Sequence, residues 1–141
     1  CDLVVAADDA VFGTPEINVG LWPYVISVPL LRSMPPKRAL ELMMTGRRID
    51  AAEADRFGFV ARLVAVDELR SATTELARGL SEAPTGVMAL GRDSFYRVVD
   101  ASATDALAHL QAMLSLGSSL DAATEGTTAF LEKRRPNWSG S

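Results

Sequence analysis

The residues best suited to chemistry lie in one short stretch, Phe12-Gly-Thr-Pro-Glu16-Ile17. A glycine and a proline bracket the Glu16 carboxylate, which comes after an apolar run that we expect to form a strand. The carboxyl end of a strand is a common place for an active site. Apolar neighbours such as Ile17, Leu21 and Trp22 would hold the carboxylate partly out of water and suit it to general acid–base work. Alternatively, Glu16 caps the following turn or faces solvent.

Other catalytic patterns are missing from the sequence. One cysteine and one histidine cannot build a Cys/His zinc site, so we predict no metal site. A Ser-His-Asp triad would need His109, which lies four residues after Asp105 in a predicted helix and so forms an ordinary i,i+4 pair. No glycine-rich phosphate loop and no nucleophile elbow occur.

Composition excludes several classes of protein. Apolar residues make up 48% and charged residues 23% of the 141 residues, which is a globular balance. The net charge of −4 disfavours a strongly basic nucleic-acid binder. No apolar run approaches the roughly 18 residues of a membrane span, and no signal peptide opens the chain. The single cysteine, Cys1, cannot form an internal disulfide, so we expect a reducing, cytoplasmic compartment.

The strands needed to position Glu16 are few. Leu3 to Ala7 reads as a strand buried on both faces, and Val11-Phe12 as a second strand that Gly13 ends. The only other good candidate runs from Val60 to Val66. Three short strands cannot cover one another, and the chain opens on Cys1 rather than methionine. We therefore expect a processed chain or part of a longer polypeptide, with part of the sheet elsewhere.

Helical patterns dominate after Pro23. Pro29 predicts a break or kink, and Pro35-Pro36 predicts the end of the first helical segment. A short helix comes next from Lys37 to Met44, with Leu40, Met43 and Met44 on one side and Gly46 after its end. Asp50 and Glu53 have capping-box spacing and predict a helix that Gly58 ends.

The second half of the chain reads as helix throughout. Asp67 is a candidate N-cap for an apolar stripe, and Pro84 fits the first position of the next helix. Thr124 to Leu131 predicts a last helix interrupted by Gly126, before a loose tail from Pro136 to Ser141. A few strands followed by many helices favour an α+β fold over regular βαβ alternation.

Three motifs in order carry a family resemblance. They are Cys1-Asp-Leu-Val-Val-Ala6 followed by Phe12-Gly-x-Pro-Glu-Ile-Asn-x-Gly20, then Ala39 to Ala54 with its Thr45-Gly46 pair, and then Glu125-Gly-x-x-Ala-Phe-Leu-Glu-Lys-Arg134. Together they resemble the enoyl-CoA hydratase/isomerase, or crotonase, family over essentially the whole chain. The resemblance implies a crotonase/ClpP-like fold, with the end of the spiral β/α core at 1–66. It also implies a helical region at 67–141 that makes trimer contacts and carries a CoA-side tail.

The resemblance also implies a site. Glu16 matches a catalytic carboxylate beside the α and β carbons of a thioester, where it donates or relays a proton. The substrate pocket would then include Pro15, Ile17, Trp22 and Tyr24. Phe130 and Lys133 match positions that approach the CoA bound to a neighbouring subunit, although Phe130 could instead be core and 133–135 a solvated tail. No metal or redox cofactor is implied, because the CoA thioester is the substrate.

Two departures from the family limit the expected activity. Bulky residues from Trp22 to Ser27 replace the glycine-rich loop that comes after the Pro-Glu-Ile motif in many hydratases, so the acyl pocket should differ in shape. The two N–H groups of the family's oxyanion hole belong to segments that precede Cys1. We therefore expect the C-terminal half of an acyl-CoA enzyme, inactive alone. It would act in a homotrimer or hexamer, or with a complementing N-terminal half. The rival interpretation is a non-catalytic truncated or oligomerisation piece.

Overall fold

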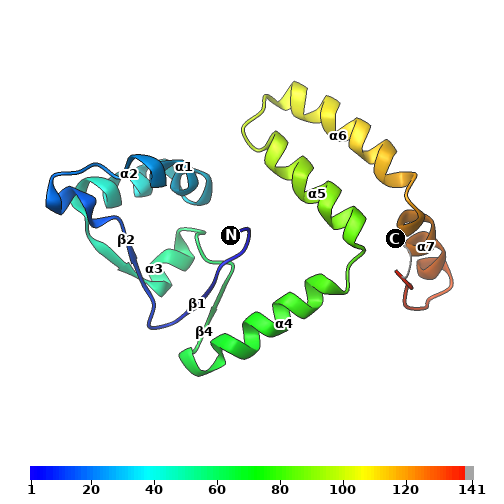
Figure 1. Ribbon diagram of the computed structural model, residues 1–141, viewed down its shortest axis with the longest axis horizontal. Coiled ribbons are helices and arrows are strands. Elements are labelled where there is room, and N and C mark those ends of the chain that lie inside the picture. The colour runs from blue at the N-terminus through cyan, green and yellow to red at the C-terminus, as the bar shows by residue number, and fades with distance from the viewer. Residues whose placement is uncertain (139–141) are drawn as a thin grey trace. The chain divides into compact units, whose positions relative to one another are not determined.

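The computed structural model describes residues 1–138 and divides into two units, Cys1–Leu76 and the residues from Ala77 onward (Figure 1). The first unit holds short strands and helices, and the second is helical. The separate roles predicted for 1–66 and 67–141 stay predictions. None of the helices in residues 1–138 is long and apolar enough to cross a membrane.

Short strands frame the first unit. They are β1 (Val5–Ala7), β2 (Val11–Gly13), β3 (Arg48–Asp50) and β4 (Arg62–Val64). β1 pairs in parallel with β4, whereas β2 pairs antiparallel with β3, so that Phe12 lies opposite Ile49. The predicted strand at Val11-Phe12 is confirmed, including its end at Gly13. β3 was missed because its three residues alternate polar and apolar directly before a capping box.

The other two predicted strands are shorter in the structure than in the sequence pattern. β1 is confirmed as a strand with both Ala6 and Ala7 buried, but it begins only at Val5, and Leu3 lies outside it and is exposed. β4 ends at Val64 because Val66 begins a 3-10 turn, η2 (Val66–Glu68), with Asp67 inside it rather than capping a helix.

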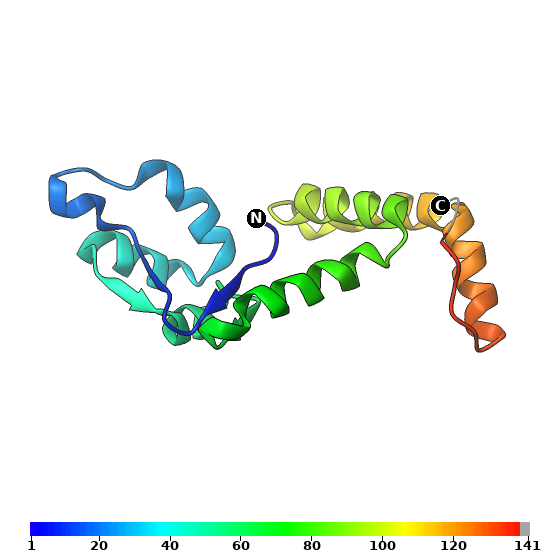
Figure 2. The ribbon, with the colours of Figure 1, turned by 60° about the horizontal axis from the view of Figure 1, so that its bottom comes forward.

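Two helices cover the strands of the first unit, α1 (Tyr24–Ser33) and α2 (Pro36–Thr45) (Figure 2). α1 runs through Pro29, so the helix is not broken there, while the alternative of a kink stays a prediction, and the chain becomes extended only at Met34. The first helical segment ends before Pro35-Pro36, as predicted, and Pro36 then begins α2, because proline is well accommodated in the first turn of a helix.

The buried face of α2 is also not the predicted one. Ala39, Leu42 and Met43 face the core at i, i+3 and i+4 spacing, whereas Leu40 and Met44 are exposed. α2 carries apolar residues on more than one face, so periodicity alone could not select the buried face.

The core of the first unit lies between these helices and the strands. Its larger buried side chains are Leu30, Met34, Leu42, Met43, Ile49 and Val60. Phe12 and Phe59 meet beside it edge to face, with ring centroids 5.3 Å apart. Each fully buried aliphatic side chain stabilises the fold by about 1.5–3 kcal/mol. This core fixes β2 and therefore the segment directly after it.

A capped helix comes directly after β3. In α3 (Ala51–Arg56), Asp50 Oδ1 accepts a hydrogen bond from the Glu53 backbone N–H at 2.7 Å, as the capping-box prediction required. Gly58 adopts a left-handed conformation with φ 82° just beyond this helix, where glycine carries no Cβ penalty.

The second unit consists of helices that succeed one another along the chain. They are the end of α4 (Leu69–Ser81), α5 (Thr85–Val98), α6 (Ala103–Ser118) and α7 (Asp121–Leu131), and α5 and α6 lie side by side (Figures 1 and 2). Pro84 precedes α5 as its N-cap instead of occupying its first position. Gly126 lies inside a continuous α7, so the predicted interruption is wrong. The end of the predicted loose tail, 139–141, lies outside the described residues.

Candidate active site

Glu16 lies on a 3-10 helix, η1 (Pro15–Val19), that begins immediately after β2. Thr14 occupies the N-cap, and Pro15 fills the first position with its fixed φ. Gly20 ends the turn at φ 76°, and its N–H donates to the Ile17 carbonyl at 3.1 Å. Glu16 is therefore held in a tight turn at the carboxyl end of a strand.

Two buried side-chain oxygens in this turn have no hydrogen-bond partner among the described residues. They are Thr14 Oγ1 and Glu16 Oε2. Thr14 also makes no side-chain cap bond, although a threonine at this position commonly does. A buried polar group left unpaired costs about 1–3 kcal/mol, and native proteins contain few of them. Two such atoms within three residues indicate a site whose hydrogen-bond partners come from elsewhere.

Two glycines allow the backbone around η1 to approach closely. A Cβ on Gly46, which has φ 61°, would lie 2.7 Å from Ile17 Cγ2 and 3.0 Å from Asn18 Nδ2. A Cβ on Gly13 would lie 3.1 Å from the Arg47 carbonyl oxygen. The residues just beyond α2 therefore lie against both ends of the segment that carries Glu16.

A cavity of about 140 Å³ lies beside this segment. Its lining is apolar apart from Thr14 and comprises Phe12, Gly13, Thr14, Ile26, Pro29, Leu30, Met34, Leu42, Ile49 and Phe59. None of the predicted pocket residues lines it. Ile17 and Trp22 are half-buried, Pro15 is exposed, and the Tyr24 side chain is 76% exposed at the start of α1. Their assignment to a substrate pocket stays a prediction.

The residues predicted to bind CoA lie in the second unit. Phe130 is 81% exposed near the end of α7, so the alternative that it is a core residue fails within this chain. Lys133 is exposed and has a positive φ of 55° just beyond the helix. The Lys133 N–H donates to the Phe130 carbonyl at 3.2 Å, which keeps the two residues on one turn.

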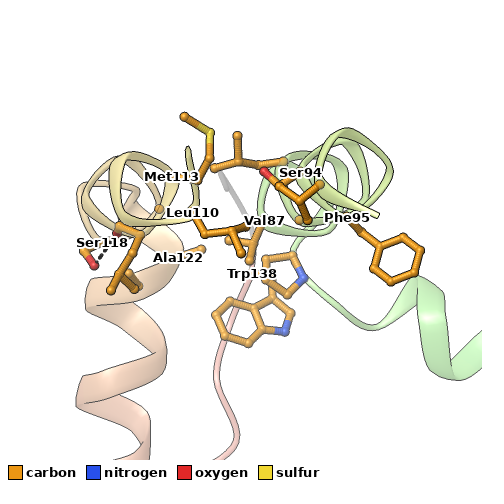
Figure 3. Close-up of a pocket in the computed structure, with 15 residues that line it drawn as sticks. Val87, Ser94, Phe95, Leu110, Met113, Ser118, Ala122 and Trp138 are labelled. Atoms are coloured by element: carbon orange, nitrogen blue, oxygen red, sulfur yellow. Dashed lines mark hydrogen bonds between the residues drawn. The ribbon is translucent and has the colours of Figure 1, made fainter. Parts of the chain in front are cut away.

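The second unit also contains a larger apolar cavity, of about 690 Å³ (Figure 3). It lies along α5, α6 and the start of α7, and Trp138 closes one side. In Figure 3 Phe95 points away from Trp138, whereas Val87 and Leu110 lie near the indole. No predicted site residue lines this cavity.

A cluster of charged side chains that the sequence interpretation missed lies in the first unit, at Arg47, Glu41 and Glu53. The Arg47 guanidinium makes two hydrogen bonds to Glu41 and two to Glu53, at distances from 2.6 to 3.0 Å. These hydrogen bonds lower the pKa of both carboxyl groups. The only sequence signal was a glutamate six residues before the arginine and another six residues after it, which is no recognised motif.

Metal-binding geometry is not found in the described residues. No group of three or more His, Cys, Asp and Glu side chains could hold an ion among residues 1–138. His109 lies half-buried on α6, with Nε2 unpaired in the part of the chain that the structure describes.

Comparisons with known proteins identify the family. The family model for Enoyl-CoA hydratase/isomerase matches residues 1–141. The enoyl-CoA hydratase domain-containing protein 3, mitochondrial, of Xenopus laevis is 36% identical over 141 residues, covering 100% of this chain and 48% of that protein. A probable enoyl-CoA hydratase of Mycobacterium leprae is 35% identical, covering 98% of this chain and 54% of that protein.

Solved structures agree with this match. The crystal structure of an enoyl-CoA hydratase from Mycobacterium smegmatis has a TM-score of 0.96 at 35% identity, covering 99% of this chain and 54% of the other. Human enoyl-CoA hydratase domain-containing protein 3 has a TM-score of 0.94 at 36% identity, covering 98% and 55%. The chain belongs to the enoyl-CoA hydratase/isomerase family, and it shares the mixed helix and strand fold of these proteins.

The chain spans about half the length of the relatives it matches. The match therefore compares this chain with about half of each relative, and the other half of each relative has no counterpart among these 141 residues. The comparisons support the family, but they do not support the finer prediction that the chain is the family's C-terminal half.

Proposed function

We propose that the intact protein acts on an acyl-CoA thioester, by hydration or isomerisation through a stabilised enolate. Family membership supports the class of substrate. The observation that carries the proposal is the buried Glu16 Oε2, which has no partner among the described residues and lies at the end of β2. A carboxyl group with a buried, unpaired oxygen can exchange a proton with a substrate.

Glu16 is the proton carrier of the proposed reaction. During hydration the oxygen of a water molecule bonds to the β carbon of the conjugated thioester. A proton from the Glu16 carboxyl group bonds to the α carbon, and a proton of the attacking water restores the carboxyl group. The negative charge that develops on the thioester oxygen needs two N–H donors. In this proposal those donors come from residues beyond these 141.

The remaining features of the proposal concern binding and assembly. Pro15, Ile17, Trp22 and Tyr24 surround the acyl group. Phe130 and Lys133 meet the adenine and the phosphates of CoA, and the 81% exposure of Phe130 supports such a contact, because phenylalanine is usually buried. CoA is part of the substrate, so no separate cofactor is used. We place the protein in the cytoplasm as a homotrimer or hexamer, away from membranes and nucleic acid.

The test is a substitution at Glu16 in the full-length protein. Glu16→Gln should preserve folding and the binding of butyryl-CoA while lowering the turnover of crotonyl-CoA by about 10²-fold or more. Turnover is measured by the loss of the ultraviolet absorbance of the conjugated thioester. Glu82→Gln, the same change at an exposed residue just after α4, is the matched control and should leave turnover unchanged. Equal turnover in both variants would overturn the assignment.

A second candidate function is a non-catalytic oligomerisation piece. Exposed apolar side chains along the helices of the second unit favour it, including Leu107, Leu114 and Leu131. Both candidates predict that the 141-residue chain alone does not turn over crotonyl-CoA. They differ when the rest of the protein is supplied, because only the enzyme proposal expects activity to appear, and only with Glu16 intact.

A further inference from the structure

Arg47 joins two helices through one guanidinium group. Its Nε donates to Glu41 Oε1 at 2.6 Å, and one terminal nitrogen donates to Glu41 Oε2 at 2.9 Å. The same nitrogen reaches Glu53 Oε1 at 2.7 Å, and the other reaches Glu53 Oε2 at 3.0 Å. Glu41 belongs to α2 and Glu53 to α3, so the guanidinium fixes the connection between these helices.

The backbone of this connection touches the Glu16 segment on both sides. Before Glu16, Gly13 pairs with Arg48 across the β2–β3 ladder, and a Cβ on Gly13 would lie 3.1 Å from the Arg47 carbonyl oxygen. After Glu16, a Cβ on Gly46 would lie 2.7 Å from Ile17 Cγ2. Residues 46–48 therefore lie against Gly13 and Ile17, on either side of the stretch that carries Glu16.

We propose that Arg47 is a positioning residue for Glu16, acting through the backbone of residues 46–48. This inference rests on the proposed function, because it assumes that the placement of the Glu16 carboxylate determines turnover. A shift in the 46–48 backbone is transmitted to η1 because no gap separates the two segments. Misplacing a catalytic group by about 1 Å can cost about 10²-fold in rate.

The geometry requires arginine at this position. A guanidinium presents a planar set of donors that grips a carboxylate with two parallel bonds, whereas a lysine ammonium is a single point charge on a flexible stem. Roughly one-third of the Arg47 side chain is exposed. Solvent screening therefore keeps its contribution to overall stability small. Substitution of Arg47 should therefore cost the protein little stability. Because the backbone of residues 46–48 contacts the segment that carries Glu16, the substitution can still change the rate without unfolding the protein.

The experiment compares Arg47→Lys and Arg47→Met in the full-length protein with Arg62→Lys as the matched control. Arg62 makes a single exposed ion pair with Glu75 at 3.1 Å, also in the first unit. With crotonyl-CoA as substrate, we expect kcat to fall about tenfold in Arg47→Lys and further in Arg47→Met. KM and the binding of butyryl-CoA should stay within about twofold, and Arg62→Lys should match the unmodified protein.

Substitution of either glutamate partner of Arg47 provides a further test. Glu41→Gln and Glu53→Gln each weaken one half of the clamp, so each should lower kcat by less than Arg47→Met does. All variants are assayed well below their melting temperatures, so that the folded fraction is equal. A rise in KM with kcat unchanged, or equal losses in Arg47→Lys and Arg62→Lys, would overturn the proposal.

Failure of the positioning role is distinguishable from failure of the proposed function. If Glu16→Gln abolishes turnover while both Arg47 variants keep full kcat, the proposed function stands and the positioning role is wrong. If Glu16→Gln keeps full turnover, the proposed function fails and the positioning role fails with it.

Discussion

The two units of the chain bury their apolar side chains to very different extents. The first unit encloses Leu30, Leu42, Met43 and Ile49 between strands and helices. In the second unit, the buried apolar side chains among the described residues are alanines, Ala122 and Ala129. Leucines and phenylalanines along α5, α6 and α7 are largely exposed. Burial of large side chains is the main source of folding free energy, so the first unit carries the stability.

This difference explains where a catalytic carboxylate can be held. Positioning a side chain requires surroundings that resist displacement, which a close-packed core provides. Glu16 comes after a strand anchored in such a core, whereas Phe130 and Lys133 lie at the end of a helix whose buried apolar side chains are alanines. Regions with few buried contacts open at low free-energy cost. We therefore expect the first unit to hold the catalytic carboxylate rigidly, and the second unit to make adaptable contacts with CoA.

The largest difference in the free energy of unfolding should separate two leucine-to-alanine variants, one in each unit. Leu42 is 3% exposed and Leu107 is 69% exposed. Leu42→Ala should lower the free energy of unfolding by about 2–5 kcal/mol, because it leaves a cavity in the core. Leu107→Ala should change it by less than about 0.5 kcal/mol. Urea denaturation measures both, and equal losses would remove the distinction between the units.

Glycine-to-alanine changes should have opposite signs in the two units. Gly46→Ala forces a left-handed alanine, at about 1–2 kcal/mol, and pushes its Cβ against Ile17, so it should destabilise the first unit and displace η1. Gly91→Ala lies inside α5 with open space around it and should stabilise that helix by about 0.5–1 kcal/mol. Thermal melts give both signs. A stabilised Gly46→Ala would contradict the close contact with η1.

Helix caps offer a smaller comparison. Asp50 accepts the Glu53 N–H at 2.7 Å, and Ser102 accepts the Asp105 N–H at 3.2 Å. Asp50→Ala and Ser102→Ala should each cost about 1 kcal/mol locally. In hydrogen exchange, Asp50→Ala should lower protection throughout the first unit, whereas Ser102→Ala should affect only the first turns of α6. Spread of the Ser102→Ala effect across the second unit would show a cooperativity that its sparse burial does not predict.

The smallest effect is an acid titration at the end of α7. Hydrogen bonds from the Arg134 side chain and the Asn137 N–H lower the pKa of Glu125 from 4.5 to about 2. Because the folded pKa lies below the ordinary value, this pair stabilises the fold above about pH 4.5 and loses that effect as the pH falls towards 2. Carboxyl NMR should give a midpoint near 2 for Glu125. Arg134→Met should return it towards 4.5, and an unchanged midpoint would remove Arg134 as the cause.

Glu41 and Glu53 extend this comparison to the first unit. Their pKa values are also lowered by an arginine, Arg47, so their pairing is likewise lost on acidification. The consequence should differ between the units. Acid release of Glu125 affects only a helix end, whereas acid release of the Arg47 clamp frees residues 46–48 and should lower turnover as well.

Much of the local structure was readable from the sequence, because its causes lie within a few residues. The strand ending at Gly13, the N-cap of α3 at Asp50 and the glycine after α2 each depend on immediate neighbours, and each is confirmed. Predictions of which face of a helix is buried were less reliable. The sequence pattern placed Leu40, Met43 and Met44 on one side of α2, but packing buried Met43 together with Ala39 and Leu42.

Residue types and short spacings were enough to indicate the family, the α+β character and the stretch that carries Glu16. The folded chain was needed to reveal that Thr14 and Glu16 each leave a buried oxygen unpaired among the described residues, and that the Arg47 side chain binds both Glu41 and Glu53. Burial and long-range hydrogen bonds arise when separate segments meet, as α2 and η1 do, or β2 and β3. No local pattern encodes that meeting, because it depends on how the core packs.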